Sequence, residues 1–488
     1  MSFFIAAVAA QAAPPQVVQV HTNTSDIREL LWDGQVLWAA TGGGLEAWSE
    51  DGRLLAHATI ELPTTDLVDV AYTDTLVVTT GELGSARWDE QTGAFVPAVA
   101  PAMSWRTMAV EVRSEGLVIG EDTLALGCPV LDVAVAEDIR IACLFTSFVY
   151  DGEELVEVGI PATAAHPEGW GLRGGGVITD DAGRIGAVPG AVTSLEKVGD
   201  AWFIGTEDGL YLLENSLERL TPDGQICGNF ITGADRFRGE LVVTTFQDGA
   251  CRFDGESWHP IEGLPGRLVN DVVVHGESAW MATSHGLARW DGDSVEVITE
   301  GASGRGRPGL QHDVVTALAS GERLWMSDLL GPVSVDEGYW RRHRFSVFGT
   351  SYQAVAACGP EAWVASEDAG VSHWSGRRWS HHDGSTGLPD DWVMAVACTE
   401  GEAWAGTYRD GVWRWDGRSW TAVETPDDWI LSLAIAEEGL YVGTLGGLFL
   451  VGDETVTIEV LDPRVHQLSV TEEELFVGTE GGLTTYMR

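Results

Sequence analysis

A short pattern of a strand, a glycine turn and a second strand recurs along almost the whole chain of 488 residues. Clear copies begin at Leu37, Ala201, Ala279, Ala403, Leu440 and Leu475, and weaker ones at Leu76, Leu241, Leu324 and Ala362. Their opening apolar residues lie about 35 to 45 residues apart, which is the length of one four-stranded propeller blade. No stretch shows sustained 3.6-residue apolar periodicity. The repeat therefore predicts an all-β chain without long helices.

Each copy contains the residues that a small antiparallel sheet needs. Residues 404–407 (WAGT) are typical of a short strand. A glycine follows where a tight hairpin needs positive φ, as at Gly209, Gly286, Gly411 and Gly447. An Asp-Gly turn and an aromatic residue then open an outer strand, as at Trp258, Trp379 and Trp420. A further strand with apolar residues three apart precedes each hairpin, and we place it innermost.

The copies add up to a β-propeller with 12 or 13 four-stranded blades, most simply two tandem six- or seven-bladed rings. A single large ring is the alternative. We expect an N-terminal propeller over residues 14–228, with weak blades at 102–190, and a C-terminal propeller over residues 229–488. Residues 16–21 (QVVQVH) form an orphan strand, which could pair with the last blade and close a ring.

Net charge limits the partners of the chain. The charge is −46, and Lys197 is the single lysine of the sequence. Phosphate binding needs dense Lys and Arg, so we expect no nucleic acid partner. Anionic lipid would also repel such a chain. A solvated, soluble surface explains the charge, and attraction of basic ligands is the alternative.

The N-terminus predicts export. Residues 3–10 form a short apolar run, and residues 10–12 (AQA) fit a signal-peptidase site, so residues 1–13 are a predicted signal peptide. No Lys or Arg precedes the run, and an ordinary strand is the alternative reading. No later apolar run approaches the roughly 20 residues of a membrane span, so we expect no membrane insertion. The expected location is the periplasm or the exterior.

Six cysteines fall into three pairs of sequence neighbours. The pairs are Cys128 with Cys143, Cys227 with Cys251, and Cys358 with Cys398. Disulfides would suit an oxidising compartment, and the spacings match no zinc motif. For Cys358 and Cys398, which lie on predicted inner strands, free thiols in the core are an equal alternative.

One segment resembles a known repeat. Residues 387–417 (GLPDDWVMAVACTEGEAWAGTYRDGVWRWDG) closely resemble the two-component regulator propeller repeat, and residues 263–265 (GLP) start another good copy. The resemblance covers nearly all of residues 26–488 and is poor between 102 and 190. It implies an extracytoplasmic, sensor-type propeller that binds glycan fragments or other ligands. The chain departs from that layout, because it shows no kinase, DNA-binding or transmembrane part.

Enzymatic motifs are scarce. Residues 366–374 (SEDAGVSHW) resemble the Asp-box of sialidase-type propellers, but a hairpin turn common to all copies explains them better. His373, His381, His382 and Asp383 form the densest histidine cluster, yet adjacent residues on a strand point opposite ways, which disfavours a metal site. We therefore expect no catalytic residues, no metal and no cofactor. A propeller lyase or glycosidase and a pure interaction scaffold are the alternatives.

The best candidate site lies where the inner strands begin. Trp392 and Trp429 each follow an Asp-Asp pair, which includes Asp391 and Asp428, and Arg464 has the same place in the last blade. A surface that mixes Trp, Arg and Asp suits stacking and hydrogen bonding. These five residues predict a binding site for an unknown glycan, peptide or protein ligand.

Overall fold

The computed structural model describes residues 15–488, apart from residues 60, 82, 107, 114–115, 180–182, 223, 301–308, 344–348 and 453. The predicted signal peptide at residues 1–13 lies outside the described residues. Within them, strands dominate, and a 3₁₀ helix, η1 (Gly384–Thr386), is the helical element. The described part holds no helix that is long and apolar enough to span a membrane.

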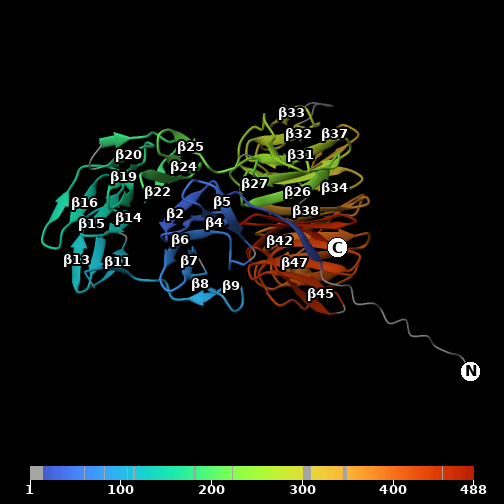
Figure 1. Cartoon of the computed structure of the whole chain (residues 1–488). Coiled ribbons are helices and arrows are strands. Elements are labelled where there is room, and N and C mark those ends of the chain that lie inside the picture. The colour runs from blue at the N-terminus through green and yellow to red at the C-terminus, as the bar shows by residue number, and fades with distance from the viewer. Residues whose placement is uncertain are drawn as a thin grey trace, which may run out of the picture. The chain divides into compact units, whose positions relative to one another are not determined.

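The strands form thirteen antiparallel sheets of four strands each over the described residues (Figure 1). Twelve sheets consist of four consecutive strands, with the inner strand first and the outer strand last. This is the order that the sequence predicts. Between residues 102 and 190, where the repeat is poor, the chain still forms three such sheets. The chain is an all-β propeller protein.

The chain divides into two units, one of residues 22–225 and one of residues 1–21 and 226–488. We call them the six-sheet unit and the seven-sheet unit. The strands of the six-sheet unit are β2 (Ile27–Trp32), β3 (Leu37–Thr41), β4 (Gly44–Trp48), β5 (Leu54–Ala58), β6 (Leu67–Tyr72), β7 (Leu76–Thr80), β8 (Ser85–Asp89), β9 (Ala94–Ala98), β10 (Met103–Trp105), β11 (Met108–Arg113), β12 (Gly116–Ile119), β13 (Asp122–Ala125), β14 (Val130–Val135), β15 (Ile139–Cys143), β16 (Ser147–Tyr150), β17 (Leu155–Glu157), β18 (Ala162–His166), β19 (Gly169–Leu172), β20 (Val177–Thr179), β21 (Gly183–Ile185), β22 (Val192–Val198), β23 (Ala201–Thr206), β24 (Gly209–Leu213) and β25 (Leu217–Arg219).

The seven-sheet unit starts and ends the chain. Its strands are β1 (Gln16–His21), β26 (Ile231–Phe237), β27 (Glu240–Thr245), β28 (Ala250–Phe253), β29 (Trp258–Pro260), β30 (Val269–His275), β31 (Ser278–Thr283), β32 (Gly286–Trp290), β33 (Val295–Ile298), β34 (Val315–Ser320), β35 (Leu324–Asp328), β36 (Gly331–Asp336), β37 (Tyr339–Arg342), β38 (Tyr352–Cys358), β39 (Glu361–Ser366), β40 (Val371–Trp374), β41 (Trp379–His382), β42 (Val393–Thr399), β43 (Glu402–Thr407), β44 (Val412–Trp415), β45 (Trp420–Val423), β46 (Ile430–Ala436), β47 (Gly439–Thr444), β48 (Leu448–Val451), β49 (Thr455–Ile458), β50 (Val465–Val470), β51 (Glu474–Thr479) and β52 (Leu483–Met487). Its inner strands pack side by side in chain order, and β50 packs against β26.

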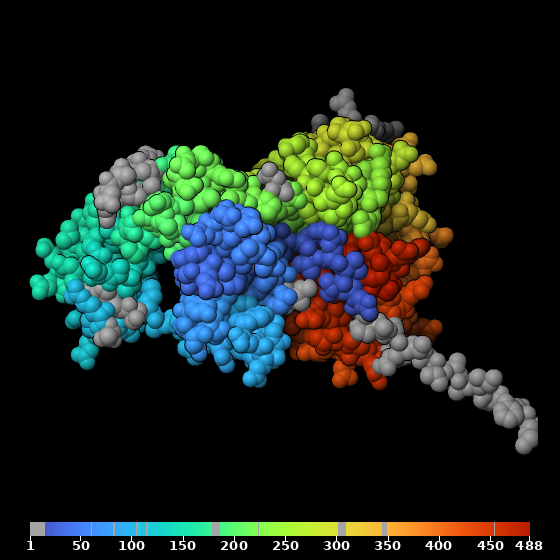
Figure 2. Space-filling view, viewed as in Figure 1, coloured from blue at the N-terminus to red at the C-terminus, as the bar shows by residue number. Residues whose placement is uncertain are grey.

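The N-terminal strand completes the last sheet of the seven-sheet unit. Strand β1 pairs with β52, from Gln16 opposite Met487 to His21 opposite Leu483, and the sheet order is β1-β52-β51-β50. In Figure 2 the dark-blue atoms of this strand lie beside red atoms of the C-terminal sheets. The pairing suggested by the sequence for residues 16–21 is confirmed. Strand β1 therefore covers the edge of β52, which could otherwise pair with a strand of another molecule.

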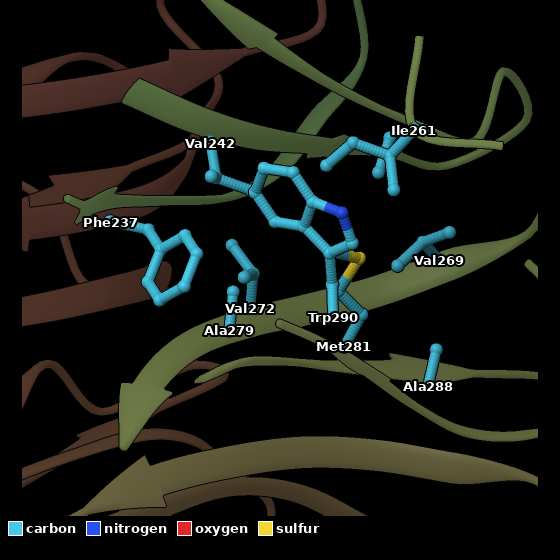
Figure 3. Close-up of a cluster of buried hydrophobic side chains, with 10 residues drawn as sticks. Phe237, Val242, Ile261, Val269, Val272, Ala279, Met281, Ala288 and Trp290 are labelled. Atoms are coloured by element: carbon cyan, nitrogen blue, oxygen red, sulfur yellow. The ribbon is translucent and has the colours of Figure 1, made fainter. Parts of the chain in front are cut away.

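Tight turns and aromatic packing hold the sheets. Gly286 has φ 128°, and a Cβ added there would lie 2.8 Å from the carbonyl oxygen of Ile298, so the hairpin needs glycine. The core lies between neighbouring sheets. In Figure 3 the Trp290 ring lies among Phe237, Val242 and Met281, with its centroid 5.2 Å from that of Phe237. A tryptophan thus fills the contact between these two neighbouring sheets.

All three cysteine pairs are disulfides. Cys128 bonds Cys143, Cys227 bonds Cys251, and Cys358 bonds Cys398. The last bond joins inner strands β38 and β42 of adjacent sheets. The alternative of free thiols at Cys358 and Cys398 is therefore wrong. Although inner-strand positions favour small buried residues, the two Cα atoms lie 6.0 Å apart, within disulfide reach.

Candidate functional site

The inner strands of the seven-sheet unit surround an axial cavity of about 280 Å³. Each strand has a register shift after its first residue, as between Val393 and Ala395 in β42, which is typical of a β-bulge. The residue inside the shift lines the cavity. These residues are Thr232, Asn270, Thr316, Gln353, Met394, Leu431 and His466. The cavity therefore has a mainly polar lining.

Two sets of residues lie where these inner strands begin, and we call them together the mouth. The first set directly precedes each inner strand and comprises Phe230, Leu268, Val314, Ser351, Trp392, Trp429 and Arg464. The second set lies in the hairpins after the second strands and comprises Phe246, Ser284, Leu329, Glu367, Tyr408, Leu445 and Glu480. The backbone N–H of a hairpin residue donates to the carbonyl oxygen of its first-set neighbour, as Tyr408 does to Trp392 at 3.0 Å.

Two of the five residues predicted to bind a ligand meet through a third aromatic ring. The rings of Trp392 and Tyr408 are stacked, with centroids 4.1 Å apart and planes inclined by 16°. Tyr408 also lies 5.0 Å from Trp429, whose side chain is 42% exposed. The three rings form a row over two adjacent sheets. The sequence singled out both tryptophans but missed Tyr408, which occupies the hairpin position directly after the Gly-Thr pair.

Arg464 is already engaged in ion pairs. Its guanidinium lies 3.1 Å from Oδ1 of Asp462 and 2.8 Å from Oε2 of Glu480. His466 Nε2 lies 3.0 Å from the other oxygen of Glu480. Asp462 is almost fully buried, so this network is part of the wall of the mouth. Arg464 positions its neighbours there, and its charge is balanced by two carboxylates.

Asp391 and Asp428 lie in the turns that precede Trp392 and Trp429. Oδ1 of Asp391 accepts from the N–H of Gly384 at 3.0 Å, and the carbonyl oxygen of Asp428 accepts from Gly411 at 3.0 Å. Both side chains are exposed. The first aspartate of each pair fixes the backbone before the tryptophan: Oδ1 of Asp390 and of Asp427 each accept from the backbone N–H of the tryptophan two residues later, at 3.0 Å. These aspartates therefore shape the loops that present the indoles.

Further apolar side chains extend the mouth beyond the aromatic row. Phe230 lies 5.2 Å from Phe246 and 4.9 Å from the His466 ring, measured between centroids. Phe246, Leu268 and Leu329 are exposed by more than a third of their surface. Sequence reasoning missed Phe230, Phe246 and Leu329. Their repeat positions match those of Trp392 and Tyr408, so an alignment of all seven copies by hairpin would have found them.

Two carboxylates on inner strands border the axial cavity. Asp271 accepts from the backbone N–H groups of Val272 and Leu318, both at 2.8 Å, and so links its own strand to the next inner strand. Asp235 makes the equivalent bonds one sheet earlier. Burial raises the pKa of Asp271 to about 7 and raises that of Asp235 as well.

The six-sheet unit carries a similar group of inner-strand carboxylates. Glu29, Asp69, Asp132 and Glu196 lie on β2, β6, β14 and β22. Burial raises the pKa of Asp132 to about 6 and that of Glu196 to about 7. Burial, together with the charges of Asp132 and Asp69, raises the pKa of Glu29. Among the described residues, no group of three or more His, Cys, Asp or Glu side chains is arranged to hold a metal ion.

Comparison with known proteins identifies the fold. The sequence matches no protein-family model and no curated protein. Among solved structures it is similar to PorZ, an essential bacterial surface component of the type-IX secretion system of Porphyromonas gingivalis. The identity is 14% over 97% of this chain and 86% of that chain, with a TM-score of 0.63. This likeness shows a shared fold.

Two further solved structures are similar at lower TM-scores. One is the extracellular domain of the putative hybrid two-component system BT4673 from B. thetaiotaomicron, with 16% identity over 94% of this chain and 70% of that chain, and a TM-score of 0.45. The other is virginiamycin B lyase from Staphylococcus aureus, with 10% identity over 53% of this chain and 94% of that chain, and a TM-score of 0.44.

Proposed function

We propose that this chain is a non-catalytic, extracytoplasmic binding protein in which each unit is one closed propeller ring. The mouth of the seven-sheet unit binds a peptide segment of a partner protein. The observation that carries the proposal is the aromatic row of Trp392, Tyr408 and Trp429, in which Trp429 is exposed and the other two rings are half-buried, with the exposed Phe246 and Leu268 around the same opening.

The composition of the mouth favours a peptide over other ligands. Contiguous exposed apolar side chains mark interaction surfaces, and tryptophan and tyrosine are enriched among residues that dominate binding energy. The polar axial cavity lies beside this apolar opening and holds the carboxylates of Asp235 and Asp271. A basic side chain of the peptide would enter there, while an apolar neighbour stacks on Trp429.

A catalytic role has less support at the mouth. The titratable network of Arg464, Glu480 and His466 is paired within itself, so its charges are balanced before any substrate arrives. General acid–base catalysis needs a group that is poised to exchange a proton with the substrate. A lyase or glycosidase would place such a group beside the aromatic row.

The test is a binding screen on the full chain. Immobilised protein is offered a random peptide library and, separately, an array of oligosaccharides, and hits are measured by calorimetry. We expect basic–aromatic peptides to bind, and we expect Trp429→Ala to weaken them at least about tenfold. Tyr339→Ala is the matched control, because Tyr339 is a 75% exposed aromatic of the same unit outside the mouth.

Each outcome of the screen has a definite meaning. Peptide binding that survives Trp429→Ala would overturn the mouth as the site. Oligosaccharide binding that is lost in the same variant would replace the peptide by a glycan. If neither library binds, the proposed function is wrong.

A further inference from the structure

A cavity lies between two neighbouring sheets of the six-sheet unit, those of β2–β5 and β6–β9. It measures about 920 Å³, within the range of small-molecule sites. We call it the lateral pocket. Four aromatic side chains line it, from Trp38 on β3, Tyr72 on β6, Trp88 on β8 and Phe95 on β9. Five charged side chains line it as well, and they are Asp33, Asp74, Arg87, Asp89 and Glu90.

A small residue at the end of the outer strand leaves this space open. Ala58 lines the pocket and pairs with Leu45, the residue that follows the hairpin glycine. In the seven-sheet unit, Ile298 and Ile458 have the same place, each opposite the corresponding leucine. Both isoleucines are buried in the core between their own sheet and the next. An isoleucine in the place of Ala58 would therefore fill part of the pocket.

A second small residue stands where other sheets carry a cation. In the sheet of β42–β45, Arg414 is the register partner of Trp404 and lies over its ring at 5.6 Å. The sheet of β30–β33 has the same arrangement. Trp38 has the equivalent place, three residues before the threonine that ends its strand, but its register partner is Ala47. The sheet of β2–β5 keeps the tryptophan and has no arginine opposite it.

The Trp38 indole is held in place at the pocket. Its Nε1 donates to Oδ2 of Asp33 at 2.9 Å, and Oδ1 of Asp33 accepts the backbone N–H groups of Gln35 and Val36, both at 2.8 Å. Although partial burial opposes it, these hydrogen bonds lower the pKa of Asp33, so the carboxyl is charged at pH 7. Asp33 thus brings a negative charge to the pocket, while its oxygens already accept three hydrogen bonds.

The charges that line the pocket are predominantly negative. The hydrogen bond from Thr73 and the charge of Arg87 lower the pKa of Asp74, so the charges of Arg87 and Asp74 lie near each other. With Arg87 set against Asp74, a net charge of −3 remains from the three other carboxylates, Asp33, Asp89 and Glu90. The charge of −46 on the whole chain adds to the attraction of cations.

Aromatic walls together with negative charge select one kind of cation. Aromatic rings attract a cation that lies over their faces, and quaternary ammonium groups are recognised in this way. A metal ion or a primary ammonium group must exchange its water for oxygen ligands, whereas the oxygens of Asp33 are already engaged. A quaternary ammonium group has no N–H to satisfy and an apolar surface, so aromatic rings and nearby carboxylates suffice.

We propose that the lateral pocket between the sheets of β2–β5 and β6–β9 binds a small quaternary ammonium compound. Its charged group lies beside Trp38, where other sheets have a guanidinium. The site does not depend on the peptide proposed for the mouth, which belongs to the other unit. It gives the six-sheet unit a ligand of its own.

The test is a ligand-observed NMR titration of the full chain with tetramethylammonium and choline. The matched ligand is 3,3-dimethyl-1-butanol, which has the shape of choline but carbon in the place of the charged nitrogen. We expect choline to bind about tenfold more tightly than this alcohol. The difference should shrink as salt is added, because salt screens the carboxylates at the edge of the pocket.

Four variants locate the site and test its charge. Ala58→Ile introduces the residue of the equivalent position and should abolish choline binding. Glu90 and Arg87 are both exposed. Glu90→Gln should weaken choline binding and Arg87→Gln should strengthen it, by roughly twofold to fivefold each, with little effect on the alcohol. Trp429→Ala, at the mouth, should bind choline like the unmodified chain.

Four results would overturn the proposal. The unmodified chain does not bind choline, the alcohol binds as tightly as choline, a folded Ala58→Ile variant binds choline unchanged, or Trp429→Ala abolishes the binding and so moves it to the mouth. Circular dichroism establishes that each variant is folded. If Ala58→Ile does not fold, the two charge variants decide: equal effects of Glu90→Gln and Arg87→Gln, in place of opposite ones, would reject the site.

Discussion

Asp271 illustrates how a single inner-strand carboxyl couples the stability of this fold to pH. Its two oxygens accept backbone N–H groups from two neighbouring inner strands, and burial raises its pKa to about 7. In the unfolded chain an aspartate has a pKa of about 3.9. The folded state therefore holds a proton that the unfolded state releases, so the stabilisation by this group is complete below about pH 4 and is lost as the pH rises to about 7.

We predict that Asp271→Asn removes this part of the pH dependence. The amide of the variant has one acceptor oxygen, so the variant loses one of the two backbone hydrogen bonds at every pH. Relative to the unmodified chain, this loss of stability should shrink by on the order of 1–2 kcal/mol between pH 5 and pH 8, after allowance for solvent in the cavity. The measurement is the difference in unfolding free energy between variant and unmodified chain at each pH. Taking the difference cancels the contribution of buried histidines such as His343 to the pH dependence. The lowered pKa of His343 has the opposite effect, because it favours the folded state at higher pH.

Asp293→Asn, at an exposed turn of the same unit, is the control and should leave the difference flat. A flat difference for Asp271→Asn as well would show that its carboxyl is not perturbed by the fold.

The sequence could not have identified Asp271, for a physical reason. In a regular strand, alternate residues share a face of the sheet. The run VNDVVV at residues 269–274 does not tell which of its residues face the cavity, because the bulge between Val269 and Asp271 shifts the alternation by one residue. By contrast, Trp392 and Trp429 lie outside the strands, directly after an Asp-Asp turn, so their identification did not depend on this alternation.

Tyr408 was missed because it lies in a hairpin, where no alternation of apolar residues marks a side chain as part of a site.

Strand β1 shows how a single element can complete a sheet whose other three strands lie at the far end of the chain. It is the outer strand of the last sheet, and its final residue, His21, also contacts the sheet of β26–β29 in the same unit. His21 Nδ1 accepts from Nε1 of Trp258 at 3.1 Å, and the two ring centroids are 4.9 Å apart. The strand thus joins the sheet of β52 to that of β29 by backbone and side-chain contacts.

We predict that a chain that begins at Thr22 unfolds at a lower temperature than the full chain. Removal of β1 exposes the edge of β52 and the Trp258 indole, and the midpoint should fall by roughly 5 °C or more. The free edge should also promote self-association, measured by light scattering. A synthetic peptide of residues 16–21 should restore the midpoint when added in excess, while a version with proline in place of Val20 should not. An unchanged midpoint in the shortened chain would contradict the role of β1.

The positions of the strands could be predicted from the sequence wherever the turn residues between them could be recognised. Gly209 and Gly286 have strongly positive φ and mark hairpins that the sequence located. Between residues 102 and 190 the tryptophans and Gly-Thr pairs are sparse, yet β12 and β15 keep apolar residues such as Leu117 and Ile141 in the core. Packing between the sheets requires apolar residues at these positions, so the sheets form even where the turn residues of the repeat are not recognisable.

At the scale of the whole molecule, the six-sheet unit is an insertion between β1 and β26. Thr24 and Gln225 lie at its two ends and are hydrogen bonded, with Thr24 N donating to Oε1 of Gln225 at 2.7 Å. In the seven-sheet unit, His21 pairs with Leu483, and Ile226 packs in the cluster that contains Leu483 and Trp258. Within each unit the two chain ends at the junction are therefore close. The sequence suggested that β1 pairs with the last sheet, but a count of repeats did not reveal that residues 22–225 form a separate unit inserted after it.

We predict that replacement of residues 22–225 by a short Gly-Ser linker leaves the seven-sheet unit folded. His21 and Ile226 already pack around the same two residues, so a linker of a few residues spans them, and loop closure costs little at that length. The shortened protein should keep its own cooperative unfolding transition and its binding at Trp429. Residues 22–225 alone should also fold, since their ends meet without help from the other unit.

Calorimetry of the full chain, the shortened protein and residues 22–225 tests this prediction. Two transitions in the full chain that match those of the separate units would establish independent folding. A seven-sheet unit that fails to fold without the insertion would mean that the inserted unit holds β1 in place, and the chain would then be a single cooperative structure.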